Sequence, residues 1–166
     1  MSPARVLAFV CAVFALLALI GQALPKAGFA VSGTAPGSAV PSYRNAVLPL
    51  PGLQQAATGS GSVTFAGDAD GIVRKVPLLL RQRGQLLPAL SLEALRVAQG
   101  AGAIVVKTSD GSGNLGGGRA EHDVVSVKVG SFEVPTTESG ALWMHYTEPQ
   151  PQRVVPAWKI LSGAVP

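Results

Sequence analysis

Hydrophobic residues follow one another almost without interruption at the start of the chain and alternate with polar residues further along. Val6 to Leu24 (VLAFVCAVFALLALIGQAL) carries no charge and follows Arg5. Such a run predicts a membrane-directed segment in residues 1–26, either a secretory signal peptide cleaved after Ala23 or an uncleaved transmembrane anchor. A buried core element of a soluble domain is the remaining interpretation.

The positive charge of Arg5, just before this apolar run, predicts on which side of the membrane the rest of the chain lies. Arg5 would hold the N-terminus inside, so residues 27–166 would lie outside the cytoplasm whether or not the segment is cleaved. The single cysteine, Cys11, lies within the run, which excludes an internal disulfide and a four-cysteine zinc site. We therefore expect a membrane-associated protein whose soluble part is periplasmic or extracellular.

The segment from Ala27 to Gly61 is rich in Gly, Ala, Ser and Pro, which predicts mainly irregular structure with one short helix. Pro51 can open that helix, because its fixed φ suits the first turn and its missing N–H would be unpaired there anyway. Leu53 to Thr58 would form the body of the helix.

A strand, a tight turn and a second strand follow in the predicted order. Ser62 to Ala66 is the first strand, Gly67 to Gly71 (GDADG) the turn, and Ile72 to Arg83 the longer second strand. Asp and Gly suit the turn because Asp side chains bond nearby backbone N–H groups and Gly accepts positive φ. We therefore predict a hairpin, with Pro77 indicating an edge position or a bulge.

The remaining chain alternates between helical and strand patterns. Pro88 to Gln99 (PALSLEALRVAQ) has the apolar spacing of a helix that ends at Gly100. Together these patterns predict an α/β (α+β) fold, a mixed sheet with hairpins and a few short helices. The other predicted elements are strands at Ala103 to Lys107, Val124 to Val129, Phe132 to Val134 and Ala141 to His145, and a last helix at Pro156 to Leu161.

Composition and charge narrow the class of protein. The 166 residues are 48% hydrophobic and 13% charged, which excludes a disordered tail and suits one packed domain. The net charge is +4, yet the basic residues are scattered apart from Arg74, Lys75, Arg81 and Arg83. Alternation along a strand would place Lys75, Arg81 and Arg83 on one solvated face. Nucleic acid is therefore not expected as a partner.

A glycine-rich stretch imitates a nucleotide-binding motif. Gly111, Gly113 and Gly116 have the spacing of the dinucleotide fingerprint. That fingerprint requires a helix at its last glycine, whereas two more glycines and a β-rich segment follow here. We interpret the stretch as a hairpin loop.

Metal and catalytic patterns are incomplete. Asp68 and Asp70 before Gly71 start like a calcium loop, but the third acidic ligand and the closing glutamate are missing. His122 and His145 are too far apart in sequence to form a zinc motif, and no serine stands in a nucleophile elbow. We therefore expect neither enzymatic activity nor a metal or cofactor.

The order of these segments resembles a known family. Four stretches carry the resemblance: GSVTFAGDADGIVRKVPLLL, LPALSLEALRVAQG, VKVGSFEVPTTESGALWMHYTEP and VVPAWKILSG. They are similar to the second type of CHASE domain, the cyclase and histidine-kinase associated sensory extracellular module. The most specific parts are the D-x-D-G-x-x-R-x-x-P stretch from Asp68 to Pro77 and the turn from Val134 to Gly140. Relative to the family, the chain is expected to be truncated at both ends.

The resemblance implies that residues 27–166 are a partial extracytoplasmic sensory domain. Such domains belong to bacterial proteins that carry adenylate or guanylate cyclase, histidine kinase or protein kinase modules in the cytoplasm. The implied partners are an undefined small molecule or environmental stimulus, the membrane, and a second copy in the full receptor. No catalytic residue is implied, and Asp70 and Arg74 are the first residues to test for ligand binding. The alternative is a small exported binding or structural protein that acts alone.

Overall fold

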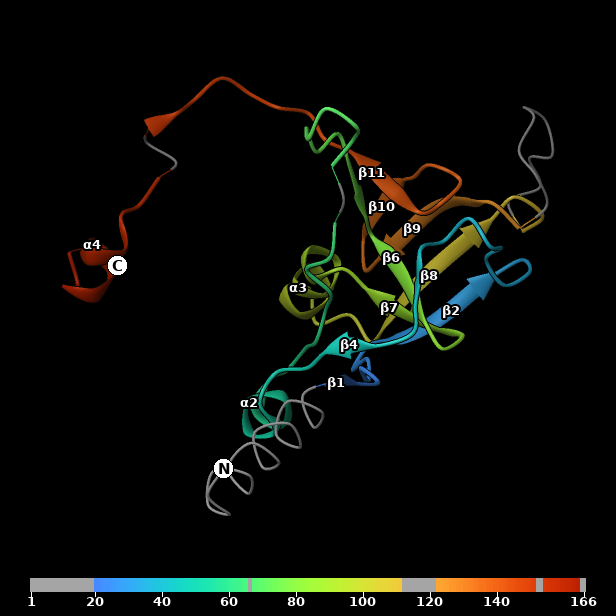
Figure 1. Cartoon of the computed structure of the whole chain (residues 1–166), viewed down its shortest axis with the longest axis horizontal. Helices are drawn as coiled ribbons and strands as arrows, with labels where there is room; N and C mark the ends of the chain where they lie inside the picture. The colour runs from blue at the N-terminus through green and yellow to red at the C-terminus, as the bar shows by residue number, and fades with distance from the viewer. Residues whose placement is uncertain (1–19, 66, 112–121, 152–153, 165–166) are drawn as a thin grey trace, which may run out of the picture.

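The computed structural model describes residues 20–65, 67–111, 122–151 and 154–164. Within these ranges the strands form four small sheets, and the helices are short (Figure 1). The predicted α/β (α+β) class is therefore confirmed. Residues 1–19 of the predicted membrane-directed segment, 1–26, lie outside the described ranges.

The largest sheet has the order β10-β9-β8-β2. Its β2 strand runs parallel to β8, whereas β8, β9 and β10 are joined antiparallel. The strands are β2 (Gly28–Ser32), β8 (Ala103–Thr108), β9 (Val124–Val129) and β10 (Phe132–Pro135).

The core lies on one face of this sheet. Ile104 is paired with Val129 and Val106 with Val127, and all four side chains are at most 1% exposed. Burying each such aliphatic side chain contributes about 1.5–3 kcal/mol. The alternation of buried and half-buried residues along β8 follows the two-residue period of a strand.

The remaining strands form three smaller sheets. A three-stranded sheet joins β3 (Ser42–Tyr43), β6 (Leu79–Gln82) and β7 (Gln85–Pro88). Two pairs complete the set, β5 (Lys75–Pro77) with β11 (Ala141–Trp143) and β1 (Ile20–Gly21) with β4 (Ala46–Val47).

All three predicted helices are present with slightly different ends. They are α2 (Pro51–Ala56), which Pro51 opens as predicted, α3 (Leu90–Ala98) and α4 (Ala157–Leu161). In α3 the face with Leu92 and Leu95 packs into the core. Leu90 and Val97, on the other apolar face, stay 49% and 37% exposed.

The predicted hairpin of Ser62 to Ala66 with Ile72 to Arg83 is wrong. Ser62 forms only an isolated bridge to Ala89, and Ala66 lies outside the described residues. The long strand divides at Leu78 into β5 and β6, because the Leu78 N–H bonds Gly140 and its carbonyl accepts from Ala89. The chain thus passes from one sheet to another at this point, and Leu78, Leu79 and Leu80 are all buried.

This break also corrects the predicted basic face. Lys75 and Arg83 are exposed, but Arg81 is half-buried and its guanidinium donates to the Pro36 carbonyl. The actual hairpin is β6 with β7, which turns at Arg83 and Gly84 with φ of 49° and 85°.

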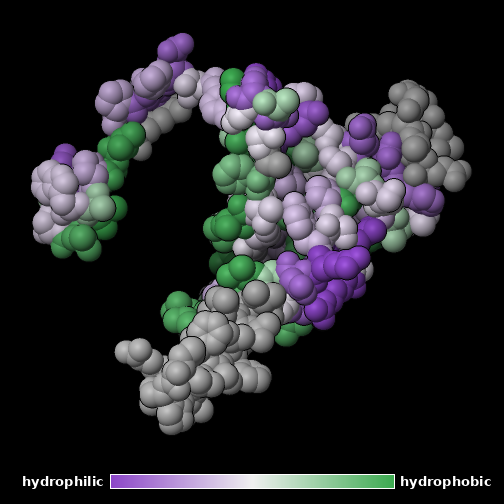
Figure 2. Space-filling model, viewed as in Figure 1, coloured by the Kyte–Doolittle hydropathy of each residue, from purple (hydrophilic) through white to green (hydrophobic). Residues whose placement is uncertain are grey.

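The C-terminal part forms an arm that leads away from the body, with α4 near its end (Figure 1). Figure 2 shows hydrophobic residues on this arm and along one flank of the body. Trp158 and Leu161 are 63% and 87% exposed. None of the helices in the described ranges has the length and hydrophobicity that crossing a membrane requires.

Candidate functional site

The first residues predicted for testing, Asp70 and Arg74, lie together on an exposed turn. Arg74 Nη2 donates to Asp70 Oδ2 at 2.7 Å, and its Nη1 donates to Asp68 Oδ2 at 3.0 Å. Asp70 Oδ1 also accepts from the Ile72 N–H at 3.0 Å. The turn is closed by the Asp68 N–H, which donates to the Ile72 carbonyl. Both carboxylates therefore fix the turn through Arg74.

The electrostatics of the turn agree with this structural role. The hydrogen bonds from Arg74 and from the Ile72 N–H hold the pKa of Asp70 below its usual range, and the two carboxylates raise the pKa of Arg74. All three side chains are 41–50% exposed. Within the described residues, no three His, Cys, Asp or Glu side chains are grouped as metal ligands would be.

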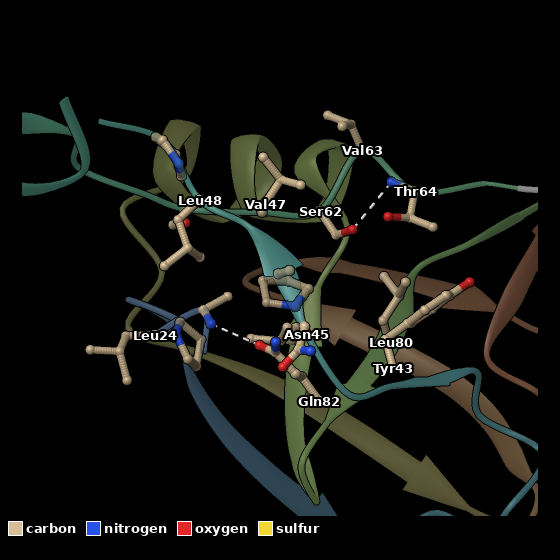
Figure 3. A pocket seen from close by; sticks show the side chains of 18 of the residues that line it. Leu24, Tyr43, Asn45, Val47, Leu48, Ser62, Val63, Thr64, Leu80 and Gln82 are labelled. Carbon is tan, nitrogen blue, oxygen red and sulfur yellow. Dashed lines mark hydrogen bonds between the residues drawn. The ribbon is translucent and has the colours of Figure 1, made fainter. Parts of the chain in front are cut away.

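A cavity lies elsewhere, beside the three-stranded sheet (Figure 3). It is a cleft of about 570 Å³ bounded by β3, β4, the β6–β7 hairpin and the segment at 60–64. This volume is within the range of sites for small organic ligands. Its wall includes Leu24, Tyr43, Val47, Val63, Leu80 and Gln82.

The alternation of side chains along β6 determines which of them face the cleft. Leu80 and Gln82 share one face of β6 and are 2% and 1% exposed, whereas Arg81 between them extends to the other face and reaches Pro36. The cleft therefore receives an aliphatic and an amide side chain from β6, not the guanidinium.

Gln82 connects the cleft to the beginning of the described chain. Its Oε1 accepts from the Ala23 N–H at 2.7 Å, and its Nε2 donates to the Gly21 carbonyl at 2.8 Å. Figure 3 shows the first of these bonds beside Leu24. A buried amide with both ends bonded fixes the segment after β1 against the sheet.

Several other side chains that line the cleft are apolar and open to solvent. Val47, Val63 and Leu24 are 83%, 71% and 62% exposed. Large apolar side chains lining a concave surface are typical of a ligand site.

A second hollow of about 490 Å³ lies by β5 and β11. Lys75 Nζ sits 4.4 Å from the centre of the Trp143 ring, and the wall includes Thr137, Glu138 and His145. The lining of this second hollow is more polar than that of the first cleft, and the hollow is shallower. We therefore regard the first cleft as the candidate functional site.

The glycine motif contributes no nucleotide site among the described residues. Gly111 follows β8, and the next described strand, β9, pairs antiparallel with β8. Gly113 and Gly116 lie outside the described ranges. Asp110, before the loop, accepts from Thr34 and Thr108, and these bonds lower its pKa.

An α/β domain with an apolar cleft at one flank offers a concave surface of the size that small organic ligands occupy. A sequence profile of the CHASE2 domain matches residues 9–166, and the chain therefore belongs to the CHASE2 domain family. CHASE2 domains are extracellular, non-catalytic sensory domains of signalling proteins. No curated protein and no solved structure matches the sequence.

Sequence reasoning missed the cleft. Its walls come from segments near residues 24, 45, 62 and 81, which only the folded sheets bring together. The one local signal is an exposed apolar residue in a Ser- and Gly-rich segment, as at Val63.

Proposed function

We propose that this chain is the extracytoplasmic input domain of a bacterial transmembrane signalling protein, with an adenylate or guanylate cyclase, histidine kinase or protein kinase as its output. The observation that carries this proposal is the CHASE2 match over residues 9–166. The apolar run from Val6 to Leu24 supports attachment to the membrane or export through it.

A sensory domain works by biasing an equilibrium between two receptor states. A stimulus can shift that equilibrium only by its difference in affinity for the two states. The cleft supports this role because Gln82 joins it to Gly21 and Ala23. Both residues lie at the C-terminal end of the apolar run from Val6 to Leu24, so a ligand in the cleft would act on the end of the membrane-directed segment. Two copies would pair in the full receptor.

Topology is tested by fusing alkaline phosphatase, which is active only outside the cytoplasm, after Pro166 of the full chain. The fusion is expected to be active in bacterial cells. Replacing Leu16 and Leu19 with arginine, at a cost of about 2.5–3.5 kcal/mol per charge in a membrane helix, should abolish that activity. The matched control is Val154→Arg together with Leu161→Arg, which leaves the apolar run intact. An inactive parent fusion would overturn the extracytoplasmic assignment.

The receptor assignment is tested by reading the coding sequence beyond Pro166. Membrane spans followed by a cyclase or kinase are expected. A stop codon directly after this domain would instead favour a small exported protein acting alone.

A further inference from the structure

We propose that the cleft beside the three-stranded sheet binds a small, uncharged, mainly apolar molecule that carries a hydrogen-bonding oxygen, such as an alcohol or a carbonyl compound. The inference rests on the proposed sensory function for its biological meaning, since such a molecule would be the stimulus. It concerns the cleft alone, and its test does not depend on topology.

The charge of the ligand follows from the scarcity of charged side chains in the cleft. Among the described residues that line it, Arg81 is the only one with a charged side chain. Its guanidinium donates to the Pro36 carbonyl, and Pro36 does not line the cleft. An ionised ligand would therefore lose water without meeting a counter-charge, which is costly in an apolar site. An uncharged ligand has no such cost.

The polar groups of the cleft favour an oxygen on the ligand. Asn45 Oδ1 accepts from Arg83, which leaves the Asn45 Nδ2 hydrogens without a partner among the described residues. Ser62 Oγ accepts from the Thr64 N–H at 3.1 Å, so its own hydroxyl hydrogen is available. The Tyr43 hydroxyl likewise has no partner in the described part of the chain. These donors are complementary to a neutral oxygen acceptor.

The apolar walls account for the rest of the ligand. Val63 and Val47 lie on one side of the cleft and Leu80 on the other (Figure 3). Covering side chains that are 71% and 83% exposed removes apolar surface from water, at about 25 cal/mol per Å². A ligand with a ring or a branched alkyl group gains from both walls.

The test uses two photoaffinity probes that share the same aryl diazirine and carry either a neutral hydroxyl or an ionised carboxylate, trifluoromethyl-diazirinyl benzyl alcohol and trifluoromethyl-diazirinyl benzoate. The full chain is labelled over a range of probe concentrations, and the labelled positions are mapped by mass spectrometry. The alcohol is expected to label residues 43–48 and 60–64 saturably. The benzoate should label them at least about tenfold less, because its charge is buried without a partner.

Variants assign the labelling to the cleft. Val63→Trp fills the cleft from an exposed wall position, so folding is retained and labelling by the alcohol should be lost. Val154→Trp makes the same change at a position that is 70% exposed on the arm and should label as the parent chain does. Equal labelling by both probes, or labelling that Val63→Trp leaves unchanged, would overturn the proposal.

A competing occupant is the arm of a second copy, whose exposed Trp158 and Ile160 are apolar. Replacing both by serine should leave labelling by the alcohol unchanged. If labelling instead rises and a dimer measured by sedimentation disappears, the cleft holds the arm of a neighbouring copy and the small-molecule proposal fails.

Discussion

The Glu93 carboxylate is held by Arg96 through two hydrogen bonds, from Nε at 2.8 Å and from Nη2 at 2.9 Å. The two side chains are only 2% and 11% exposed. Arg96 Nη1 also donates to the Ala101 carbonyl, and Glu93 accepts from the Ser60 N–H. The ion pair thus joins α3 to the segment that forms one side of the cleft.

Replacing Arg96 with alanine is expected to destabilise the domain by about 3–5 kcal/mol, because Glu93 would be left buried without its partner. The free energy of unfolding is measured by urea denaturation. Arg44→Ala, at an exposed arginine, should stay within about 0.5 kcal/mol of the parent. A double change of Glu93 and Arg96 to leucine should recover part of the loss, and a further loss would contradict this account.

Acid should weaken the same pair. The hydrogen bonds from Arg96 hold the folded-state pKa of Glu93 below its ordinary value of 4.5. The unfolded chain therefore binds the proton more readily, so this stabilisation is present above about pH 4.5 and is lost as the pH falls through the folded pKa. Asp70, Asp110 and Glu133 have lowered pKa values too. The Glu93→Gln variant, followed by thermal melting, should therefore show a shallower acid dependence, and an identical one would refute the assignment.

Two glycines offer a matched pair of substitutions. A Cβ at Gly61 would lie 2.6 Å from the Leu90 Cα, whereas one at Gly52 would meet nothing within 4 Å. We expect Gly61→Ala to cost about 1–3 kcal/mol through this backbone clash. Gly52→Ala should stabilise α2 by up to about 1 kcal/mol. Both effects are measured by chemical denaturation, and equal effects would contradict the close approach at Gly61.

Removing the amide of Gln82 should loosen the segment after β1. Gln82→Leu leaves the Ala23 N–H and the Gly21 carbonyl without partners, at an expected cost of about 1–3 kcal/mol. Hydrogen exchange at Ala23 should accelerate. The same substitution at Gln55, which is exposed on α2, is the control, and unchanged exchange in Gln82→Leu would show that its two bonds do not fix this segment.

The turn with Asp70 and Arg74 should prove structural. Asp70→Asn is expected to accelerate hydrogen exchange at Ile72, because an uncharged amide oxygen accepts from that N–H more weakly than the carboxylate does and the ion pair with Arg74 is lost. Global stability should change little, as for exposed ion pairs generally. Labelling of the cleft should remain as in the parent, since neither residue lines it. Glu148→Gln on the exposed arm is the control. Loss of cleft labelling in Asp70→Asn would restore this turn as a binding site.

Local patterns predicted the elements whose partners are close in sequence. Val124 to Val129 and its partner β10 turn at Gly130 with a φ of 55°, and Pro51 opens a helix because its fixed φ suits the first turn. Strand β2 was missed because its pairing with β8 is parallel and long-range. The break at Leu78 was missed for the same reason, since Gly140 and Ala89 supply the bonds that cause it.

The candidate site depended still more on the fold. The pattern drew attention to Asp70 and Arg74 because charged residues at close spacing are visible in a sequence. The cleft has no such mark, because its residues are ordinary aliphatic and amide side chains from distant segments. Gln82, the residue that joins them, was included in a strand but not recognised as buried.

The parallel pairing of β2 with β8 also determines when this domain can fold. Gly28 must wait for Ala103, 75 positions later, and β8 is completed on its other side only by Val124 to Val129. Contacts of such sequence separation slow folding, because a long loop must close first. During synthesis β2 therefore has no partner until β8 has been made, whereas β3, β6 and β7 can already pair with one another. The N-terminal apolar run is made before any of these strands and is available for recognition first.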